Sequence, residues 1–240
     1  MWDASWIGNL LRGCTKCVQR YGLLATGGYL FDLFRVARAE RSEAFDVRFD
    51  TVTAQKEYPW ELPSLKHKSV AEIHPYEAVS VRLFQTILSS LSIESGGFTF
   101  VDLGSGKGRA LLLAAQYPFR KIIGIEISRE LHRVAKTNVD RYIGFTRNSI
   151  YELRCMDATT YEFGPDPMVL FLFNPFGNKT FRAVLSHLEE SIRKWPREVV
   201  IVYINPRFER VLQKSIFRRI ARGGSRLQPW SRYVVYEAKR

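Results

Sequence analysis

The sequence TFVDLGSGKG at residues 99–108 constrains the fold of this chain more than any other feature. Its first five residues have the apolar, β-branched and aromatic character of a buried strand, and Asp102 lies near the end of that strand. Gly104, Gly106 and Gly108 then alternate before RALLLAA, a segment of strong helix formers. Glycines let the backbone turn tightly and approach a ligand closely, and the amino end of the following helix faces that ligand. We therefore predict a nucleotide-binding corner made of a strand, a turn and a helix.

The spacing of these glycines distinguishes between two kinds of nucleotide site. A dinucleotide site has the pattern G-x-G-x-x-G, which would require a glycine at the position of Arg109. The pattern D-x-G-x-G-x-G resembles motif I of the class I S-adenosylmethionine (SAM) dependent methyltransferases. This resemblance implies that SAM is the cofactor and that Asp102 and the glycine loop hold its methionine part. The loop residues assigned to the cofactor are Gly104, Ser105, Gly106 and Gly108. The alternative is a glycine-rich surface turn, of the kind that follows many strands in α/β proteins.

An acidic residue at the end of a second predicted strand, residues 121–127, supports the cofactor interpretation. Glu126 lies about 20 residues beyond the glycine loop, which is the usual offset of a ribose-binding carboxylate. A carboxylate at this place accepts charge-assisted hydrogen bonds from both ribose hydroxyls. We therefore assign Glu126 and the adjacent Ile127 to the cofactor site. The alternative for Glu126 is a solvated charge at a strand end.

A third predicted strand, residues 151–156, is followed by Asp157 and Ala158. In the methyltransferase family, an acidic residue after the third strand binds the adenine amino group. The resemblance therefore implies that Asp157, with Ala158 beside it, contacts the adenine. The alternative is an aspartate that caps a turn before Thr159 and Thr160.

A fourth predicted strand is continuously apolar and ends in Asn174, Pro175, Phe176 and Gly177. This turn resembles motif IV of amino-directed methyltransferases, which has Asp or Asn, two prolines, and Tyr or Phe. The resemblance implies that the Asn174 side-chain oxygen and the next carbonyl bind the N–H of the methyl acceptor, while Phe176 packs beside it. The second proline of the motif is absent, and Gly177 follows Phe176. The alternative is an ordinary turn that Asn-Pro initiates after the strand.

Strands and helices alternate from residue 98 onward, which predicts an α/β fold with a parallel sheet and helices on both faces. The last segments predict a terminal hairpin, so the expected architecture is a doubly wound, mostly parallel, seven-strand sheet with a reversed terminal strand. We expect the methyltransferase domain to span residues 74–240 and to begin with a helix over 75–88. Residues 1–73 are expected to form an N-terminal helical extension and a cap segment, with a short strand at 45–50.

The N-terminal segment contains apolar residues at helical spacing, which predicts two helices within residues 1–40. Such helices pack on their own domain or a partner, or lie on a membrane surface. Cys14 and Cys17 form a lone C-x-x-C without further ligands, so no metal site is predicted. With Cys155 they make no disulfide framework, so we expect a reducing, cytoplasmic location. No apolar stretch is long enough for a transmembrane segment.

The chain of 240 residues is basic, with 36 Lys and Arg against 24 Asp and Glu and a net charge of +12. A basic surface favours an acidic partner, such as nucleic acid or an anionic membrane, although solubility alone also explains it.

The motifs together predict an N-directed SAM-dependent methyltransferase with a protein lysine or another amine as acceptor. The DLGSG and GIE segments also resemble those of seven-strand protein-lysine methyltransferases, including the non-SET histone lysine type. A nucleic-acid base and a small-molecule amine stay open as acceptors, as does a non-catalytic SAM-fold module that binds an acidic partner. An NAD-dependent oxidoreductase is disfavoured by Arg109 and by the terminal hairpin.

Overall fold

The structure is a computed structural model that describes residues 40–65, 72–142, 150–225 and 229–238. Its contacts divide the chain into two compact units, Met1–Ala44 and Phe45–Arg240. The helices predicted within residues 1–40, together with Cys14 and Cys17, lie outside the described residues. The expected domain boundary after residue 73 stays a prediction.

The second unit is built on a seven-stranded sheet with the order β3-β2-β1-β4-β5-β7-β6. Only β7 runs against its neighbours: it lies between β5 and β6 and pairs antiparallel with both. The predicted fold class, including the reversed terminal strand, is confirmed. The strands are β1 (Thr99–Leu103), β2 (Lys121–Glu126), β3 (Ile150–Cys155), β4 (Met168–Phe173), β5 (Val199–Ile204), β6 (Phe217–Gly223) and β7 (Tyr233–Ala238).

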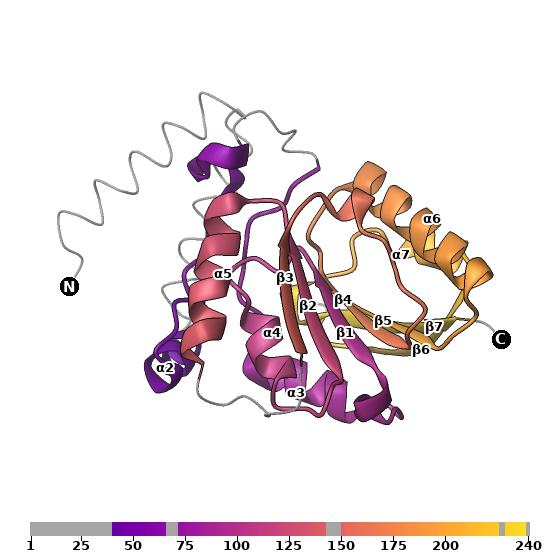
Figure 1. Cartoon of the computed structure of the whole chain (residues 1–240), viewed down its shortest axis with the longest axis horizontal. Helices are drawn as coiled ribbons and strands as arrows, with labels where there is room; N and C mark the ends of the chain where they lie inside the picture. The colour runs from indigo at the N-terminus through magenta and orange to yellow at the C-terminus, as the bar shows by residue number, and fades with distance from the viewer. Residues whose placement is uncertain (1–39, 66–71, 143–149, 226–228, 239–240) are drawn as a thin grey trace. The chain divides into compact units, whose positions relative to one another are not determined.

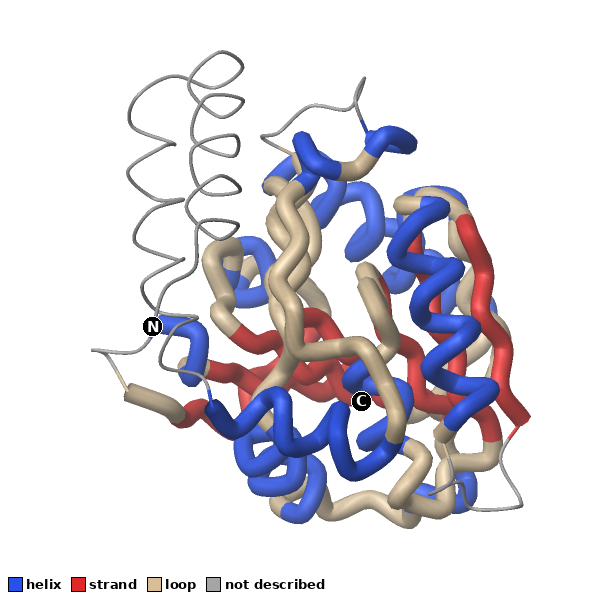
Figure 2. The backbone as a smooth tube through the Cα atoms, turned by 90° about the vertical axis from the view of Figure 1, so that its left-hand side faces the viewer, coloured by secondary structure: helices blue, strands red, loops and turns tan. Residues whose placement is uncertain are grey.

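Helices cover both faces of this sheet (Figures 1 and 2), because alternate residues of its buried strands point to opposite sides. On β1, Phe100 packs in the cluster with α3 and α4, whereas Val101 packs in the cluster with α6 and α7. Helix α5 packs beside α4. The helices of this unit are α3 (Val81–Ser89), α4 (Arg109–Ala114), α5 (Arg129–Arg141), α6 (Asn178–Lys194) and α7 (Glu209–Gln213), and α2 (Glu40–Phe49) reaches into it.

Two predictions before the sheet are wrong. The segment expected as a strand at 45–50 belongs to α2, because Phe45 and Phe49 lie on one face of that helix and both pack on Tyr142. The helix expected over 75–88 begins only at Val81, since the backbone of Tyr76 pairs with Glu57 instead. A non-local pairing of this kind leaves no periodic signal in the sequence.

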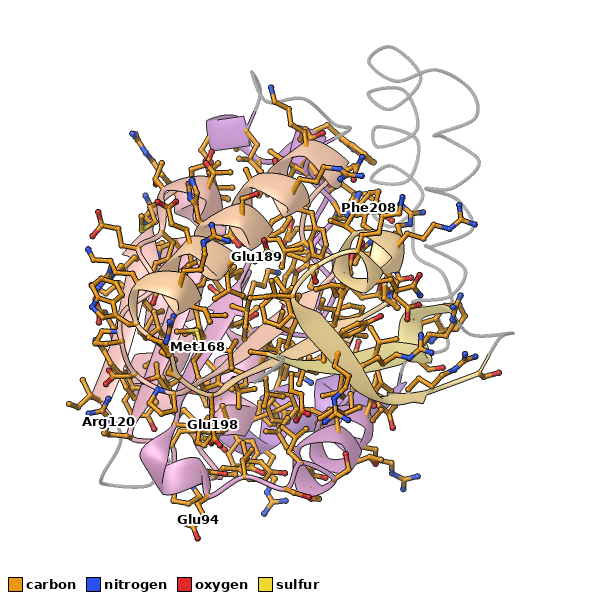
Figure 3. The ribbon with its side chains drawn as sticks, turned by 90° about the vertical axis from the view of Figure 1, so that its right-hand side faces the viewer. Glu94, Arg120, Met168, Glu189, Glu198 and Phe208 are labelled. Carbon is orange, nitrogen blue, oxygen red and sulfur yellow. The ribbon has the colours of Figure 1, made fainter. Side chains whose placement is uncertain are left out.

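The two ends of the sheet can be told apart by the residues that flank its strands. Figure 3 shows Met168 and Glu198 close together where β4 and β5 begin, with Phe208 at the opposite end, beyond the carboxyl end of β5. In open α/β sheets, ligands bind outside the carboxyl ends of the strands. Within the described residues, no helix is long and apolar enough to cross a membrane.

Candidate active site

A cavity opens at the carboxyl ends of β1, β2 and β4. The space between its lining atoms is about 1110 Å³, open solvent included, which is close to the roughly 300–1,000 Å³ of small-molecule sites. Gly108 and Asn174 do not line this cavity, whereas the other predicted site residues do: Asp102, Gly104, Ser105, Gly106, Glu126, Ile127, Asp157, Ala158, Pro175 and Phe176. Nearly all of the residues selected from the sequence therefore meet at one place.

The glycine loop needs its glycines for contacts with the protein itself. Gly104 and Gly106 have φ values of 76° and 54°, in the left-handed region that side chains disfavour. A Cβ atom on Gly106 would lie 2.0 Å from the ring of Tyr76, and one on Gly104 would lie 2.3 Å from Cβ of Pro175. Gly108 takes φ 86° as the residue before α4. The space that the glycines leave open, which we expected a ligand to fill, is thus partly filled by Tyr76 and Pro175.

Glu126 is buried at the end of β2, and backbone groups fix its carboxylate. Oε2 accepts a hydrogen bond from Gly106 N at 2.8 Å, and Oε1 accepts one from Ser128 N at 2.8 Å. Burial raises the pKa of Glu126 even though these bonds favour its ionised form. Each oxygen keeps a second lone pair, so the carboxylate still has acceptors to offer within the cavity.

Asp102 differs from Glu126 because no described residue donates a hydrogen bond to its carboxylate. Its side chain is nevertheless buried, with 4% of the residue exposed. Burial, and then the charge of Glu126, hold the pKa of Asp102 well above its usual range. An isolated buried carboxylate is unfavourable unless a cation or donors compensate it. A positively charged ligand beside Asp102 would supply that compensation.

Asp157 both caps a turn and lines the cavity, which are the two alternatives that its sequence context leaves open. Its Oδ1 accepts hydrogen bonds from Thr159 N at 2.9 Å and from Thr159 Oγ1 at 2.8 Å, so it caps the short 3₁₀ helix Ala158–Thr160. It also lines the cavity. Both bonds fall on one oxygen, so the cap and a ligand contact are compatible.

The turn after β4 is arranged differently from the motif IV expectation. Asn174 adopts φ 45°, and its side chain is buried. Its Oδ1 accepts a hydrogen bond from the hydroxyl of Tyr203 at 3.3 Å. The oxygen that was expected to bind the methyl acceptor therefore faces Tyr203, away from the cavity lining.

Residues 72–76, which we call the strap, cover this turn and were not predicted as part of the site. The backbone N–H of His74 donates to Pro175 O at 3.3 Å, and the ring Nδ1 of His74 lies 2.7 Å from Asn174 O. Gly177 N donates to Glu72 O at 3.2 Å. The strap thus pairs along the whole turn, about 100 residues away in sequence.

Glu72 anchors the start of the strap to α6. Its Oε2 accepts hydrogen bonds from Thr180 N at 2.9 Å and Thr180 Oγ1 at 2.8 Å, in the first turn of that helix. Burial opposes ionisation, but these bonds outweigh it and lower the pKa of Glu72. A carboxylate at a helix amino end is further stabilised by the helix dipole.

The other end of the strap is tied to the glycine loop. Tyr76 N donates to Glu57 O at 2.9 Å, and Lys107 Nζ, from within the loop, donates to the Glu57 carboxylate at 2.7 Å. Arg109, at the start of α4, is buried and lies 3.3 Å from Asp46. In the sequence, Arg109 served only to exclude a dinucleotide site. Its position at the start of an apolar helix was the missed signal that its guanidinium pairs with another part of the chain.

Six carboxylates line the cavity, against a single Lys or Arg side chain among the described residues, that of Arg109, which is paired with Asp46. This balance is opposite to the net charge of +12 for the whole chain. The site therefore favours cationic ligands over phosphates. The carboxylates are those of Glu57, Glu72, Glu77, Asp102, Glu126 and Asp157.

A comparison with protein families finds one match within the chain. The family described as "Histone methylation protein DOT1" matches residues 62–158, which include the strap, the glycine loop, Glu126 and Asp157 but end before the turn after β4. No curated protein sequence matches the chain. The described residues contain no group of three or more His, Cys, Asp or Glu side chains that could hold a metal ion.

Two solved structures illustrate the structural matches. Magnesium protoporphyrin IX methyltransferase from Synechocystis PCC 6803, with bound SAM, is 15% identical with a TM-score of 0.49, over 66% of this chain and 78% of that one. Ribosomal protein L11 methylase from Lactobacillus delbrueckii subsp. bulgaricus is also 15% identical, with a TM-score of 0.47, over 66% of this chain and 77% of that one.

Proposed function

Because the chain is a class I SAM-dependent methyltransferase, we propose that it methylates a nitrogen atom, namely the side-chain amine of lysine in a protein substrate. The observation that carries this proposal is the charge of the cavity. Six carboxylates surround a space that contains one paired guanidinium. A lysine ammonium is attracted into such a site, whereas the phosphates of a nucleic acid are repelled.

The residues of the cofactor half fit SAM. We propose that Asp102, which lacks a donor among the described residues, binds the ammonium of the methionine part, and that Glu126 binds the ribose hydroxyls. Asp157 then faces the adenine amino group with the oxygen that does not cap the 3₁₀ helix. Gly104, Ser105 and Gly106, with Ile127 and Ala158, line the same space. When bound, SAM supplies an electrophilic methyl group on a cationic sulfur.

The acceptor half is the turn with Pro175 and Phe176, which both line the cavity. We propose that the buried ring of Phe176 forms an apolar wall beside the acceptor nitrogen and excludes water from it. The Asn174 backbone, with its φ of 45°, sets the direction of the turn. Orientation of this kind supplies most of the acceleration in a direct group transfer.

The proposal is tested by labelling. Purified protein and tritiated SAM are incubated with a cell extract, which is then separated into protein, nucleic-acid and small-molecule fractions. We expect label in the protein fraction and methylated lysine after acid hydrolysis. Asp102→Asn should abolish the label, whereas Glu94→Gln should not, because Glu94 is exposed and does not line the cavity (Figure 3 labels it). Label in nucleic acid or in small molecules would contradict the lysine assignment.

A further inference from the structure

Resting on this proposed function, we propose that His74 accepts a hydrogen bond from the methyl-acceptor nitrogen through Nε2, the role that the motif IV pattern gave to the side chain of Asn174. His74 lies on the strap and lines the cavity beside Pro175 and Phe176. It thereby faces the space in which the acceptor nitrogen must meet the cofactor.

Two contacts hold the imidazole of His74 in place, and a third fixes its backbone. The backbone N–H of His74 donates to Pro175 O at 3.3 Å, and ring Nδ1 lies 2.7 Å from Asn174 O. The ring also stacks on Phe208, with centroids 6.5 Å apart and an interplanar angle of 15°. A ring fixed by its own contacts and by its backbone is suited to positioning a reacting atom.

The partner of Nδ1 determines the tautomer. A carbonyl oxygen can only accept a hydrogen bond, so the bond to Asn174 O requires the proton to be on Nδ1. In neutral His74, Nε2 is then an acceptor with a free lone pair, and no described residue donates to it. An acceptor is what the N–H of an incoming amine requires.

The oxygens that the motif IV pattern would use already have partners. Asn174 Oδ1 accepts from the Tyr203 hydroxyl, Asn174 O accepts from the His74 ring, and Pro175 O accepts from the His74 backbone. His74 therefore occupies one acceptor position on each of the two backbone oxygens of the turn, and it lines the cavity beside them. The absence of a second proline after Pro175 is consistent with this change of partner.

The surroundings of His74 favour the neutral form of its ring. Burial and the charge of Arg207 lower the pKa of His74, and they outweigh the opposing effects of the Asn174 bond and of Glu72. A neutral ring accepts a hydrogen bond and does not repel a lysine ammonium. One proton of the lysine ammonium first passes to Nε2 and then to solvent, which leaves a neutral amine with a lone pair. That lone pair attacks the methyl carbon; the N–C bond forms, the C–S bond breaks, and its electron pair stays on sulfur. The product leaves as the protonated methylamine.

Two substitutions at His74 separate this role from a structural one. Asn places an amide N–H where Nδ1 lies and preserves the bond to Asn174 O, but removes Nε2. Gln places an acceptor oxygen near the position of Nε2 and gives up the bond. We expect His74→Asn to lower the initial rate of label transfer, at saturating SAM, by about 100-fold, and His74→Gln to retain more of the rate. A purely structural His74 predicts the reverse order, which would overturn the proposal.

The controls use the same protein fraction as acceptor. Both variants should keep the rise in melting temperature that S-adenosylhomocysteine gives wild type, which shows that they fold. His187→Asn, at an exposed histidine of α6, should leave the rate unchanged. In wild type the rate should fall as the pH drops through the lowered pKa of His74, because protonation removes the acceptor, and His74→Gln should lack this fall. If wild type labels no protein at all, the proposed function fails, and the assignment of His74 fails with it.

A measurement on wild type keeps the test independent of folding. The ¹⁵N resonances of His74 in the complex with S-adenosylhomocysteine should show the Nδ1-protonated tautomer. Adding n-butylamine as a lysine mimic should shift Nε2 more than Nδ1. A proton on Nε2, or no change in its resonance, would overturn the proposal even if lysine is the acceptor.

Discussion

The turn after β1 and the turn after β4 lie at the carboxyl ends of neighbouring parallel strands, yet they handle their polar groups in opposite ways. In the first, which we call the cofactor corner, the buried carboxylate of Asp102 has no donor among the described residues. In the second, the acceptor corner, the oxygens of Asn174 and Pro175 all accept hydrogen bonds from the protein. In the proposed function a ligand supplies the missing partner of Asp102, whereas the strap already supplies partners to the oxygens of the acceptor corner.

The two corners also differ in how far apart in the sequence their polar groups lie. Asp102 and Glu126 belong to the strands that form the cofactor corner, so local sequence contains its chemistry. The acceptor corner is paired with His74, a residue 100 positions away from Asn174 to which we assign the acceptor role. The strap joins the two corners, because Tyr76 packs on Gly106 while His74 pairs with the acceptor turn. A substitution in one corner should therefore alter the geometry of the other corner only when it displaces the strap.

The largest expected effect comes from Gly106→Ala. The new Cβ would lie 2.0 Å from the Tyr76 ring at a φ of 54°, so both the loop and the strap must move. We expect SAM binding to become undetectable by calorimetry and label transfer to be lost. Gly97→Ala, where a Cβ meets nothing within 4 Å, is the matched control and should bind as wild type does. Normal binding by Gly106→Ala would remove the proposed coupling of the corners.

Asp102→Asn should separate binding from stability. We expect SAM affinity to fall by at least about 100-fold, since the variant lacks the charge that pairs with the cofactor's ammonium. The cofactor-free protein should instead become more stable at pH 7, by about 1 kcal/mol or roughly 2–4 °C. The folded-state pKa of Asp102 is raised, so ionisation destabilises the fold as pH rises from the ordinary aspartate pKa through the raised one. Equal wild-type and variant stability at pH 4 and at pH 8 would contradict a buried, uncompensated Asp102.

Substitutions at Glu126 should have a smaller effect on the same corner. Glu126→Ala is expected to weaken SAM by about 1.5–3 kcal/mol, the worth of hydrogen bonds to a charged group. Glu126→Gln should also weaken it, because both carboxylate oxygens accept from backbone N–H groups and the amide would turn a donor toward one of them. Calorimetry against Glu94→Gln as the control measures both. Wild-type affinity in Glu126→Ala would mean that the ribose is held elsewhere.

The smallest expected effect is at Asn174, and it tests the acceptor corner alone. Asn174→Gly preserves the left-handed backbone, and we expect SAM affinity within about twofold of wild type and only a modest loss of rate. Asn174→Ala should be less stable by about 1–2 kcal/mol, because alanine is disfavoured at a φ of 45°. Melting curves and label transfer on both variants separate the backbone from the amide. A rate loss in Asn174→Gly as large as in His74→Asn would return the acceptor role to the Asn174 side chain.

The sequence predicted most of the sheet and the cofactor corner, because both depend on local signals. A continuous apolar run marks β4, and an acidic residue at a strand end marks Glu126. The strap was missed because Pro75 resembles a helix start, while the pairing that prevents this helix comes from Glu57 and the acceptor turn. The partner of Asn174 Oδ1 was equally hidden, since Tyr203 is on the next strand of the sheet. The part of the site around Asn174 is formed by contacts between segments that are distant in the sequence, and no local motif predicts such contacts.

The decisive measurement is a titration of SAM into the purified protein, with NAD as the comparison ligand. We expect one SAM site for each chain, an affinity that weakens as Asp102 and Glu126 become protonated at lower pH, and no binding of NAD. The absence of SAM binding, or tighter binding of NAD, would contradict the assignment of the cavity to SAM.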